Sequence, residues 1–254
     1  DGKTQHCLIS GADTNKDQSY FLCQLTQDQL AKTLFPIGHL QKVEVREIAR
    51  ELNLVTAGKK DSQGLCFIGK VSLPEFLQQQ LQAKNGDIIE IPIDFYKDKP
   101  APKAMISQSQ KITYNPSDGE TIGKHVGAHF FTIGQRKGLA VGGTSEPLFV
   151  IDTDIDENIV YVGQGKDHPG LFRKALKVIR DDIHWVRDDM KIQLGVELEV
   201  NARIRYRQPL QKAKLISKKD ALYIIFEELQ SAITSGQFVA WYQGEELLGS
   251  GVIF

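Results

Sequence analysis

The residue with the clearest chemical potential is Cys66, which stands between Gly64 and Gly69 and follows the lysine pair Lys59 and Lys60. A cysteine reacts as its thiolate, and nearby cations lower the pKa of about 8.5 that a free thiol has. The glycines allow the backbone to approach a substrate closely. These residues are compatible with a nucleophilic thiol. The apolar neighbours of Cys66 fit an unreactive buried cysteine equally well, since free cysteine is among the most buried residue types.

A second candidate is the alternating segment Val196–Arg207, which predicts a β-strand with one apolar and one polar face. The polar face ends in Arg203, Arg205 and Arg207. Three arginines in a row form a ridge suited to phosphate contacts, because each guanidinium is a planar fork of several donors. A solvated strand face with Glu–Arg pairs would show the same alternation, so both interpretations remain open.

Three other patterns are weaker. The basic turn Gln135–Gly138 suits either a phosphate clamp or a plain hairpin turn. His125 and His129 have the spacing of two metal ligands on a helix, but the glycines around them oppose a helix and no third ligand is near, so we predict no metal site. The segment Gly119–Lys124 is one residue too short between its glycines for a phosphate loop, and a histidine replaces the Ser or Thr that binds magnesium.

The composition sets limits on the class of protein. The 254 residues allow two modest domains, and the net charge of −1 predicts that any polyanion site arises from local clustering. No apolar run approaches the roughly 18 residues of a membrane span, and no secretory signal is present. Cys7, Cys23 and Cys66 are too few and too scattered for a disulfide framework, which predicts a reducing compartment. The chain begins at Asp1, which is compatible with a piece of a longer protein.

Local signals predict the elements that position these residues. In the first half we expect a short strand at Cys7–Ile9, a helix that starts at the capping box of Thr26 and Gln29 and runs through Leu34, and a second helix over Lys42–Leu52. A third helix is expected from Ser72 to about Ala83.

The second half is predicted to be mainly β. A strand is expected at Asp87–Pro92, followed by a surface insertion with little core potential at 94–120. Leu148–Asp152 and Ile159–Val162 predict a hairpin, and the last third has the short strands and turn signals of a small sandwich or barrel.

Six strings of this sequence resemble the tRNA-specific 2-thiouridylases. They extend in the family's order from about residue 9 to the C-terminus, and the main departure is the longer segment 94–120. The strings are Asn15–Leu22, Leu34–Gly38, Lys60–Gly69, Thr132–Leu139, Arg205–Gln208 and Gly236-Gln237.

The resemblance implies a three-part fold. Residues 1–74 would be the α/β remnant of an adenine-nucleotide α-hydrolase-like domain, with helices of the central domain inserted at about 32–54. Residues 75–142 would form the small central domain, and residues 143–254 a C-terminal all-β barrel that binds tRNA.

The resemblance also implies an activity. The family transfers persulfide sulfur to C2 of the wobble uridine of tRNA, with ATP and magnesium as cofactors, a sulfur-relay protein as donor and a disulfide bond among its features. Cys66 matches the cysteine that carries the persulfide. A monomer in the cytoplasm is implied, with an organellar matrix as the alternative. The positions that match the family's tRNA contacts are Lys16, Asp17, Gln18, Arg205, Tyr206 and Gln237.

Several family features are missing from the sequence. The ATP-binding string Ser-Gly-Gly-x-Asp-Ser is absent, as is the second catalytic cysteine, because neither Cys7 nor Cys23 has an aspartate three residues earlier. We therefore expect the C-terminal two thirds of such an enzyme, which would bind tRNA weakly and not activate uridine alone. The alternative is a non-catalytic tRNA-binding module or degenerate paralogue. A generic barrel with a buried thiol would show no salt-dependent RNA affinity.

Overall fold

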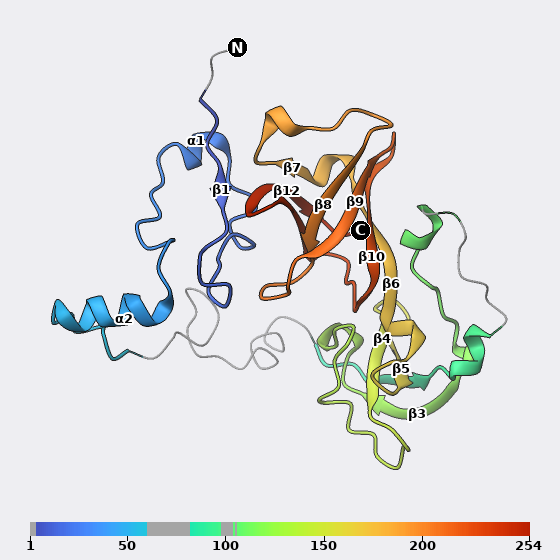
Figure 1. Ribbon diagram of the computed structural model, residues 1–254. Helices are drawn as coiled ribbons and strands as arrows, with labels where there is room; N and C mark the ends of the chain where they lie inside the picture. The colour runs from blue at the N-terminus through green and yellow to red at the C-terminus, as the bar shows by residue number, and fades with distance from the viewer. Residues whose placement is uncertain (1–3, 60–81, 98–103, 105) are drawn as a thin grey trace. The chain divides into compact units, whose positions relative to one another are not determined.

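The structure is a computed structural model that describes residues 4–59, 82–97, 104 and 106–254 (Figure 1). Its contacts divide the chain into two compact units. The first unit takes in the described residues of 1–61 together with 176–228 and 235–254, and the second those of 62–175 together with 229–234. In the described part of the chain, no helix is long and apolar enough to cross a membrane.

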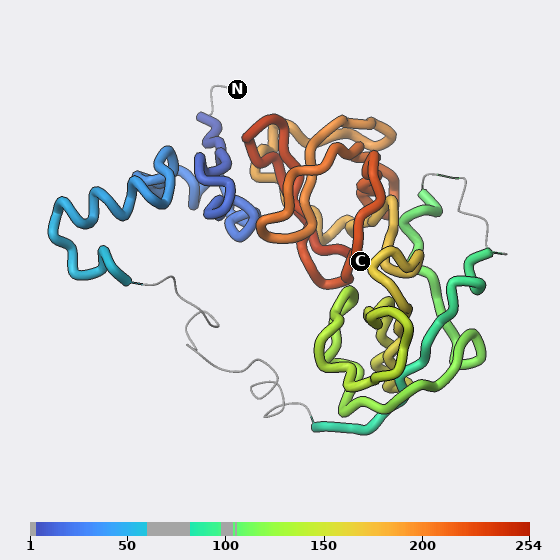
Figure 2. Tube along the Cα trace, turned by 60° about the horizontal axis from the view of Figure 1, so that its bottom comes forward, coloured from blue at the N-terminus to red at the C-terminus, as the bar shows by residue number. Residues whose placement is uncertain are grey.

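Most of the first unit is one large sheet, whose strands follow the order β1-β12-β11-β8-β9-β10-β6, with β7 also paired to β12. The hairpins β8–β9, β9–β10 and β11–β12 are antiparallel. Figure 2 shows the trace of these strands curving round on itself. The strands are β1 Leu8–Ile9, β6 Phe172–Ile179, β7 Ile183–Trp185, β8 Glu197–Arg203, β9 Gln211–Ser217, β10 Ala221–Ser231, β11 Phe238–Gln243 and β12 Glu246–Val252.

The N-terminal segment of the first unit packs onto β11 and β12. The predicted strand at Cys7–Ile9 is confirmed as β1, in which Leu8 pairs with Leu247. Leu8, Cys23 and Leu30 are buried in one cluster with residues of the large sheet, among them Tyr242. Burial of apolar side chains on both sides therefore attaches residues 8–30 to the large sheet.

Two helices follow in this unit. Helix α1, Gln27–Leu30, starts at the predicted capping box of Thr26 and Gln29 but ends at Leu30 instead of Leu34. Leu30 is buried, whereas Leu34 is 89% exposed. A helix continued to Leu34 would therefore gain no stability from burying that side chain. Helix α2, Lys42–Glu51, confirms the predicted helix, although none of its residues is buried.

The second unit is built on a four-stranded sheet of order β3-β2-β5-β4. The predicted hairpin is confirmed, because β4 and β5 pair antiparallel, and β5 also pairs with β2 in parallel. Ile88 and Ile89 of β2 belong to different core clusters, so both faces of the sheet are covered. The strands are β2 Gly86–Glu90, β3 Glu120–His125, β4 Leu148–Asp154 and β5 Ile159–Gln164.

The described part of the chain also contains short 3-10 helices, most of them in turns between strands. They are η1 Ile93–Tyr96, η2 Ile106–Ser109, η3 Pro116–Asp118, η4 Ala128–Phe130, η5 Pro169–Leu171, η6 Arg180–Asp182 and η7 Asp188–Met190.

Two expectations for this region differ from the structure. The prediction that 94–120 has little core potential is wrong, because Tyr114 is 6% exposed and Phe95 and Tyr96 pack against the same core cluster. The hydroxyl groups of Tyr96 and Tyr114 lie 2.7 Å apart, so hydrogen bonding satisfies these polar atoms in the core. The barrel was expected to start at 143, but the pairing of β5 with β2 places 148–164 in the sheet of the second unit. The predicted helix from Ser72 lies outside the described residues up to position 81.

Candidate nucleic-acid interface

The loop between β1 and α1 is organised around the buried carboxylate of Asp17, which is 4% exposed. Its Oδ1 accepts hydrogen bonds from the backbone N–H groups of Gly11 (3.1 Å) and Ser19 (3.0 Å), and its Oδ2 accepts one from the Ser19 hydroxyl (3.0 Å). Burial by itself raises the pKa of Asp17, but these hydrogen bonds and one from Arg203 outweigh burial and lower it overall. The carboxylate is therefore ionised at neutral pH and fixes the shape of the loop.

Arg203 provides the opposite charge. Its Nη2 donates to Oδ2 of Asp17 at 2.7 Å, and its guanidinium lies 4.7 Å from the ring centroid of Tyr242. The hydroxyl of Tyr242 lies 3.1 Å from that of Ser19, so β11 joins the same cluster. A buried ion pair must recover a large desolvation cost. The hydrogen bonds to Asp17 and the ring of Tyr242 offset part of it, whereas Nε of Arg203 is buried without a hydrogen-bond partner among the described residues. The pair links residues 186 positions apart and attaches the loop to β8.

Neither interpretation of Val196–Arg207, a ridge of three arginines for phosphate contacts or a solvated strand face, holds at Arg203. The β1–α1 loop covers the end of β8, so Arg203 is only 5% exposed. The strand ends at Arg203, and Arg207 lies in the following turn with a φ of 63°. A strand period places the three arginines on one face only if the strand continues past Arg203.

Next to this buried pair, the loop and the turn after β8 meet at the surface. The side-chain amide of Gln18 donates to the Tyr206 hydroxyl at 3.0 Å. The rings of Phe21 and Tyr206 are 4.6 Å apart between centroids and tilted by 43°. Phe21 is 61% exposed, so this aromatic pair faces solvent.

A pocket of about 430 Å³ opens beside the aromatic pair. The hydroxyl of Tyr20 lies 3.1 Å from the carbonyl oxygen of Ile204 and 2.9 Å from that of Phe238, which fixes the position of this side chain in the pocket wall. Burial raises the pKa of Tyr20 to about 12. Burial also lowers the pKa of Arg205, but a guanidinium stays protonated in proteins. The lining residues include no carboxylate; they are Tyr20, Phe21, Cys23, Gln24, Arg205, Tyr206, Gly236, Gln237 and Phe238.

The structure places most of the predicted tRNA contacts in this region. Gln18 bonds to Tyr206, and Arg205, Tyr206 and Gln237 line the pocket. Lys16 lies in the same loop, where its backbone N–H donates to the Asp13 carbonyl. The side chain of Asp17 is instead buried, so it holds its neighbours in place. Cys66, the predicted sulfur carrier, lies outside the described residues.

Two residues of this region were missed by sequence reasoning, and a third was misassigned. Tyr20 and Phe21 directly follow the predicted contact segment, and their aromatic character beside Lys16–Gln18 was the available signal. Arg203 was found but assigned to a solvent-facing ridge.

The two described thiols are poorly suited to nucleophilic chemistry. A hydrogen bond with Glu246, followed by burial, raises the pKa of Cys7, although Nη1 of Arg187 lies 3.3 Å from its sulfur. Burial raises the pKa of Cys23, which is 2% exposed. Both are free cysteines, so the structure contains no disulfide that joins them.

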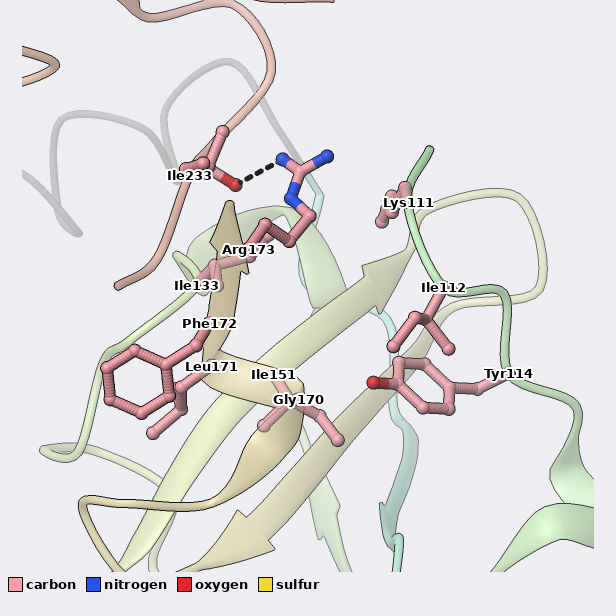
Figure 3. A pocket seen from close by; sticks show the side chains of 10 residues that line it. All are labelled: Lys111, Ile112, Tyr114, Ile133, Ile151, Gly170, Leu171, Phe172, Arg173 and Ile233. Carbon is pink, nitrogen blue, oxygen red and sulfur yellow. Dashed lines mark hydrogen bonds between the residues drawn. The ribbon is translucent and has the colours of Figure 1, made fainter. Parts of the chain in front are cut away.

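The second unit has a pocket of a different kind, drawn in Figure 3. Its volume is about 20 Å³, which is room for about one water molecule. Arg173 is one of its lining residues, and its Nη2 donates to the Ile233 carbonyl at 2.9 Å (Figure 3). Its Nη1 donates to the Ser109 carbonyl at 3.4 Å. Burial lowers the pKa of Arg173, and its donors are directed at backbone carbonyls. Arg173 therefore has a structural role here, because its hydrogen bonds hold segments of the chain together.

Family models match three successive parts of the chain. Residues 1–70 match a tRNA methyl transferase HUP domain, residues 103–164 a tRNA methyl transferase PRC-barrel domain, and residues 175–253 an aminomethyltransferase β-barrel domain. The tRNA-specific 2-thiouridylase MnmA of Christiangramia forsetii is 62% identical over 260 residues, which include the whole of this chain. The chain belongs to the tRNA-specific 2-thiouridylase family.

Other members of this family agree. The protein of the same name from Flavobacterium johnsoniae is 61% identical over 261 residues, and that from Karelsulcia muelleri is 50% identical over 252. The chain spans 66% of the length of the first two relatives and 65% of the third. The predicted fold class is confirmed: parts of a HUP domain, a central domain and a C-terminal β-barrel make up a mostly β structure with few helices.

Proposed function

We propose that this chain acts in the 2-thiolation of tRNA, the ATP-dependent transfer of persulfide sulfur to C2 of the wobble uridine. In this proposal the chain supplies the persulfide-carrying Cys66 and the surfaces that bind tRNA. The names of the relatives, tRNA-specific 2-thiouridylase, support the assignment.

The observation that carries the proposal is the hydrogen bond between Gln18 and Tyr206, which are 188 residues apart. It joins two strings that match tRNA-contacting segments of the family, and Arg205 and Gln237 of the same set line the adjoining pocket. Residues that lie far apart in the sequence, and that the same resemblance assigns to tRNA contacts, thus share one surface. Separate structural roles would not require this.

Electrostatics favour a local binding site over a general one. The chain has a net charge of −1, so attraction to RNA depends on cations such as Lys16 and Arg205 at this surface. Contacts from these cations to phosphates position an RNA without reading its sequence, and they make binding weaker as salt increases.

We assign the sulfur transfer to Cys66. The terminal sulfur of its persulfide forms a bond to C2 of the uridine, and the C2–O bond of an oxygen already converted into a leaving group breaks. A second thiol then attacks the sulfur of Cys66, which releases the thiolated base and leaves a disulfide between the two thiols. The second thiol is a required co-reactant, and the raised pKa values of Cys7 and Cys23 make both poor candidates for it.

No residue of this chain is assigned to ATP. The family's Ser-Gly-Gly-x-Asp-Ser string does not occur among the 254 residues. ATP with magnesium, the sulfur-relay donor, the monomeric state and a cytoplasmic location remain inferences from the family. We also propose that the isolated chain binds tRNA weakly and does not thiolate it.

Two measurements test the proposal. The purified chain is expected to bind tRNA with an affinity that falls as salt increases, and to give no thiolated tRNA with ATP and a sulfur donor. Salt-independent binding or none would contradict tRNA binding, and ATP-dependent thiolation would contradict the expected inactivity. Binding of tRNA by a chain whose Cys66 takes up no sulfur from a persulfide donor would favour the alternative, a non-catalytic tRNA-binding fragment or degenerate paralogue.

The assignment of Cys66 has its own test. After treatment with a persulfide donor, mass spectrometry is expected to find a gain of about 32 Da, one sulfur atom, on the peptide that contains Cys66. Cys7→Ser and Cys23→Ser variants should keep this gain, and Cys66→Ser should lose it. A gain on Cys7 or Cys23 with Cys66 unmodified would refute the assignment.

A further inference from the structure

We propose that Phe21, Tyr206 and the adjoining pocket form a binding site for one unpaired nucleobase of the bound RNA. This inference rests on the proposed function, because it specifies how the same surface holds tRNA. It adds Phe21, which matches none of the predicted tRNA contacts, and it assigns the pocket a ligand of stated chemistry.

The aromatic pair is suited to stacking. Phe21 is 61% exposed and lies against Tyr206 at 4.6 Å between ring centroids, so one large apolar side chain is held at the surface with little burial of its own. Proteins recognise RNA loops mainly by stacking unstacked bases on aromatic side chains. Such stacking tolerates any base, since every base has a π face.

The pocket next to the pair suits a base and its phosphate. Its volume of about 430 Å³ lies within the roughly 300–1,000 Å³ of small-molecule sites. The side-chain amide of Gln237 lines it and has no hydrogen-bond partner among the described residues, so it offers both a donor and an acceptor to a base edge. Arg205 supplies a cation, and none of the described residues that line the pocket is a carboxylate that would repel a phosphate.

The site is also held in place before RNA binds. Gln18 fixes the hydroxyl of Tyr206, and the hydroxyl of Tyr20 lies within hydrogen-bond distance of the carbonyls of Ile204 and Phe238. The buried pair of Asp17 and Arg203 anchors the loop that carries Phe21. Because folding already orders these side chains, binding loses less conformational entropy, which favours affinity.

The test compares a tRNA anticodon stem-loop with a fully paired RNA duplex of equal length, each titrated with the 254-residue chain. Phe21→Ala is expected to weaken the affinity for the stem-loop about tenfold, which is within the loss expected when a stacked base loses its aromatic partner. Duplex binding and the salt dependence should stay unchanged. Phe21→Trp should keep the wild-type affinity. Stem-loops with 2-aminopurine in the loop should show fluorescence quenching at one position, and Phe21→Ala should abolish it.

Phe254→Ala is the matched control, because Phe254 is 60% exposed in the same unit and does not line the pocket. It should leave stem-loop affinity unchanged. If the wild-type chain binds RNA and Phe21→Ala binds the stem-loop equally well, or loses the same factor for the duplex, the nucleobase site is wrong and the proposed function stands. If the wild-type chain binds no RNA, both are wrong. Thermal unfolding of each variant shows whether a loss of binding reflects a loss of folding.

Discussion

Arg205 in the first unit and Arg173 in the second each line a pocket, and the two pockets differ in what they leave for a ligand. Arg173 donates to the carbonyls of Ser109 and Ile233 beside a space for about one water. Arg205 stands beside about 430 Å³ of open space with aromatic and amide groups around it. An arginine thus becomes part of a binding site only where the fold leaves room for a ligand next to it.

Arg203 extends the comparison, because it is only two positions from Arg205 yet is buried against Asp17. Arg203 holds the β1–α1 loop in place, whereas Arg205 lines the pocket. The following predictions separate these roles, beginning with the largest effect.

Asp17→Ala should cost about 3–5 kcal/mol of unfolding free energy, because it leaves the charge of Arg203 buried without a partner. Urea unfolding measures the loss. The double variant Asp17→Ala/Arg203→Met should regain part of it, since the unpaired charge is then gone. A double variant no more stable than Asp17→Ala would contradict this role for the pair.

Arg173→Met should cost about 1–3 kcal/mol, because the carbonyls of Ser109 and Ile233 lose their donor. The affinity of the folded protein for tRNA should not change. Unfolding and RNA titration of the same sample check both statements. Weaker RNA binding by folded Arg173→Met would place Arg173 in a binding site and remove the contrast with Arg205.

Arg205→Ala should show the opposite pattern. We expect the slope of log affinity against log salt to decrease by about 1, the loss of one phosphate contact. Arg205→Lys keeps the charge and should keep the slope. A slope that is unchanged in Arg205→Ala would show that this side chain does not contact a phosphate.

The smallest effect is a difference in pH dependence. Burial lowers the pKa of His168 below 6.5, and its ring lies 3.1 Å (Nε2) from the Ile91 carbonyl while Nδ1 accepts from Gly170 N–H at 3.3 Å. The unfolded state then binds protons more readily, so this contribution to stability is complete above pH 6.5 and is lost as pH falls below it. Asp17, whose pKa is lowered below 3.8, keeps its contribution until pH falls below that value.

The raised pKa of Asp152 in the second unit acts in the opposite direction, because acidification relieves the cost of burying its charge. Unfolding at pH 5 and pH 7 of the wild type and His168→Gln isolates the histidine. The variant should lose less stability between the two pH values. NMR titration should give His168 a pKa below 6.5, and an equal pH response of both proteins would contradict the assignment.

Much of the fold could be predicted from local patterns. The capping box of Thr26 and Gln29, the hairpin of β4 and β5 and helix α2 are set by neighbouring residues, and all three are present. The segment 94–120 was mispredicted because a long, mostly polar stretch separates Tyr114 from Phe95 and Tyr96 in the sequence. Only the fold shows that Tyr96 and Tyr114 meet and bury each other's hydroxyl groups.

The sequence by itself determined the family, the mainly β second half and the residues that match tRNA contacts, because these depend on strings and short-range periodicity. Only the tertiary structure decided that Arg203 is buried, that Phe21 lies against Tyr206 and that a pocket opens beside Arg205. Each of these depends on contact between segments more than 180 residues apart. The physical reason is that burial and pairing depend on what packs against a residue, and a strand pattern specifies its two faces without specifying what covers them.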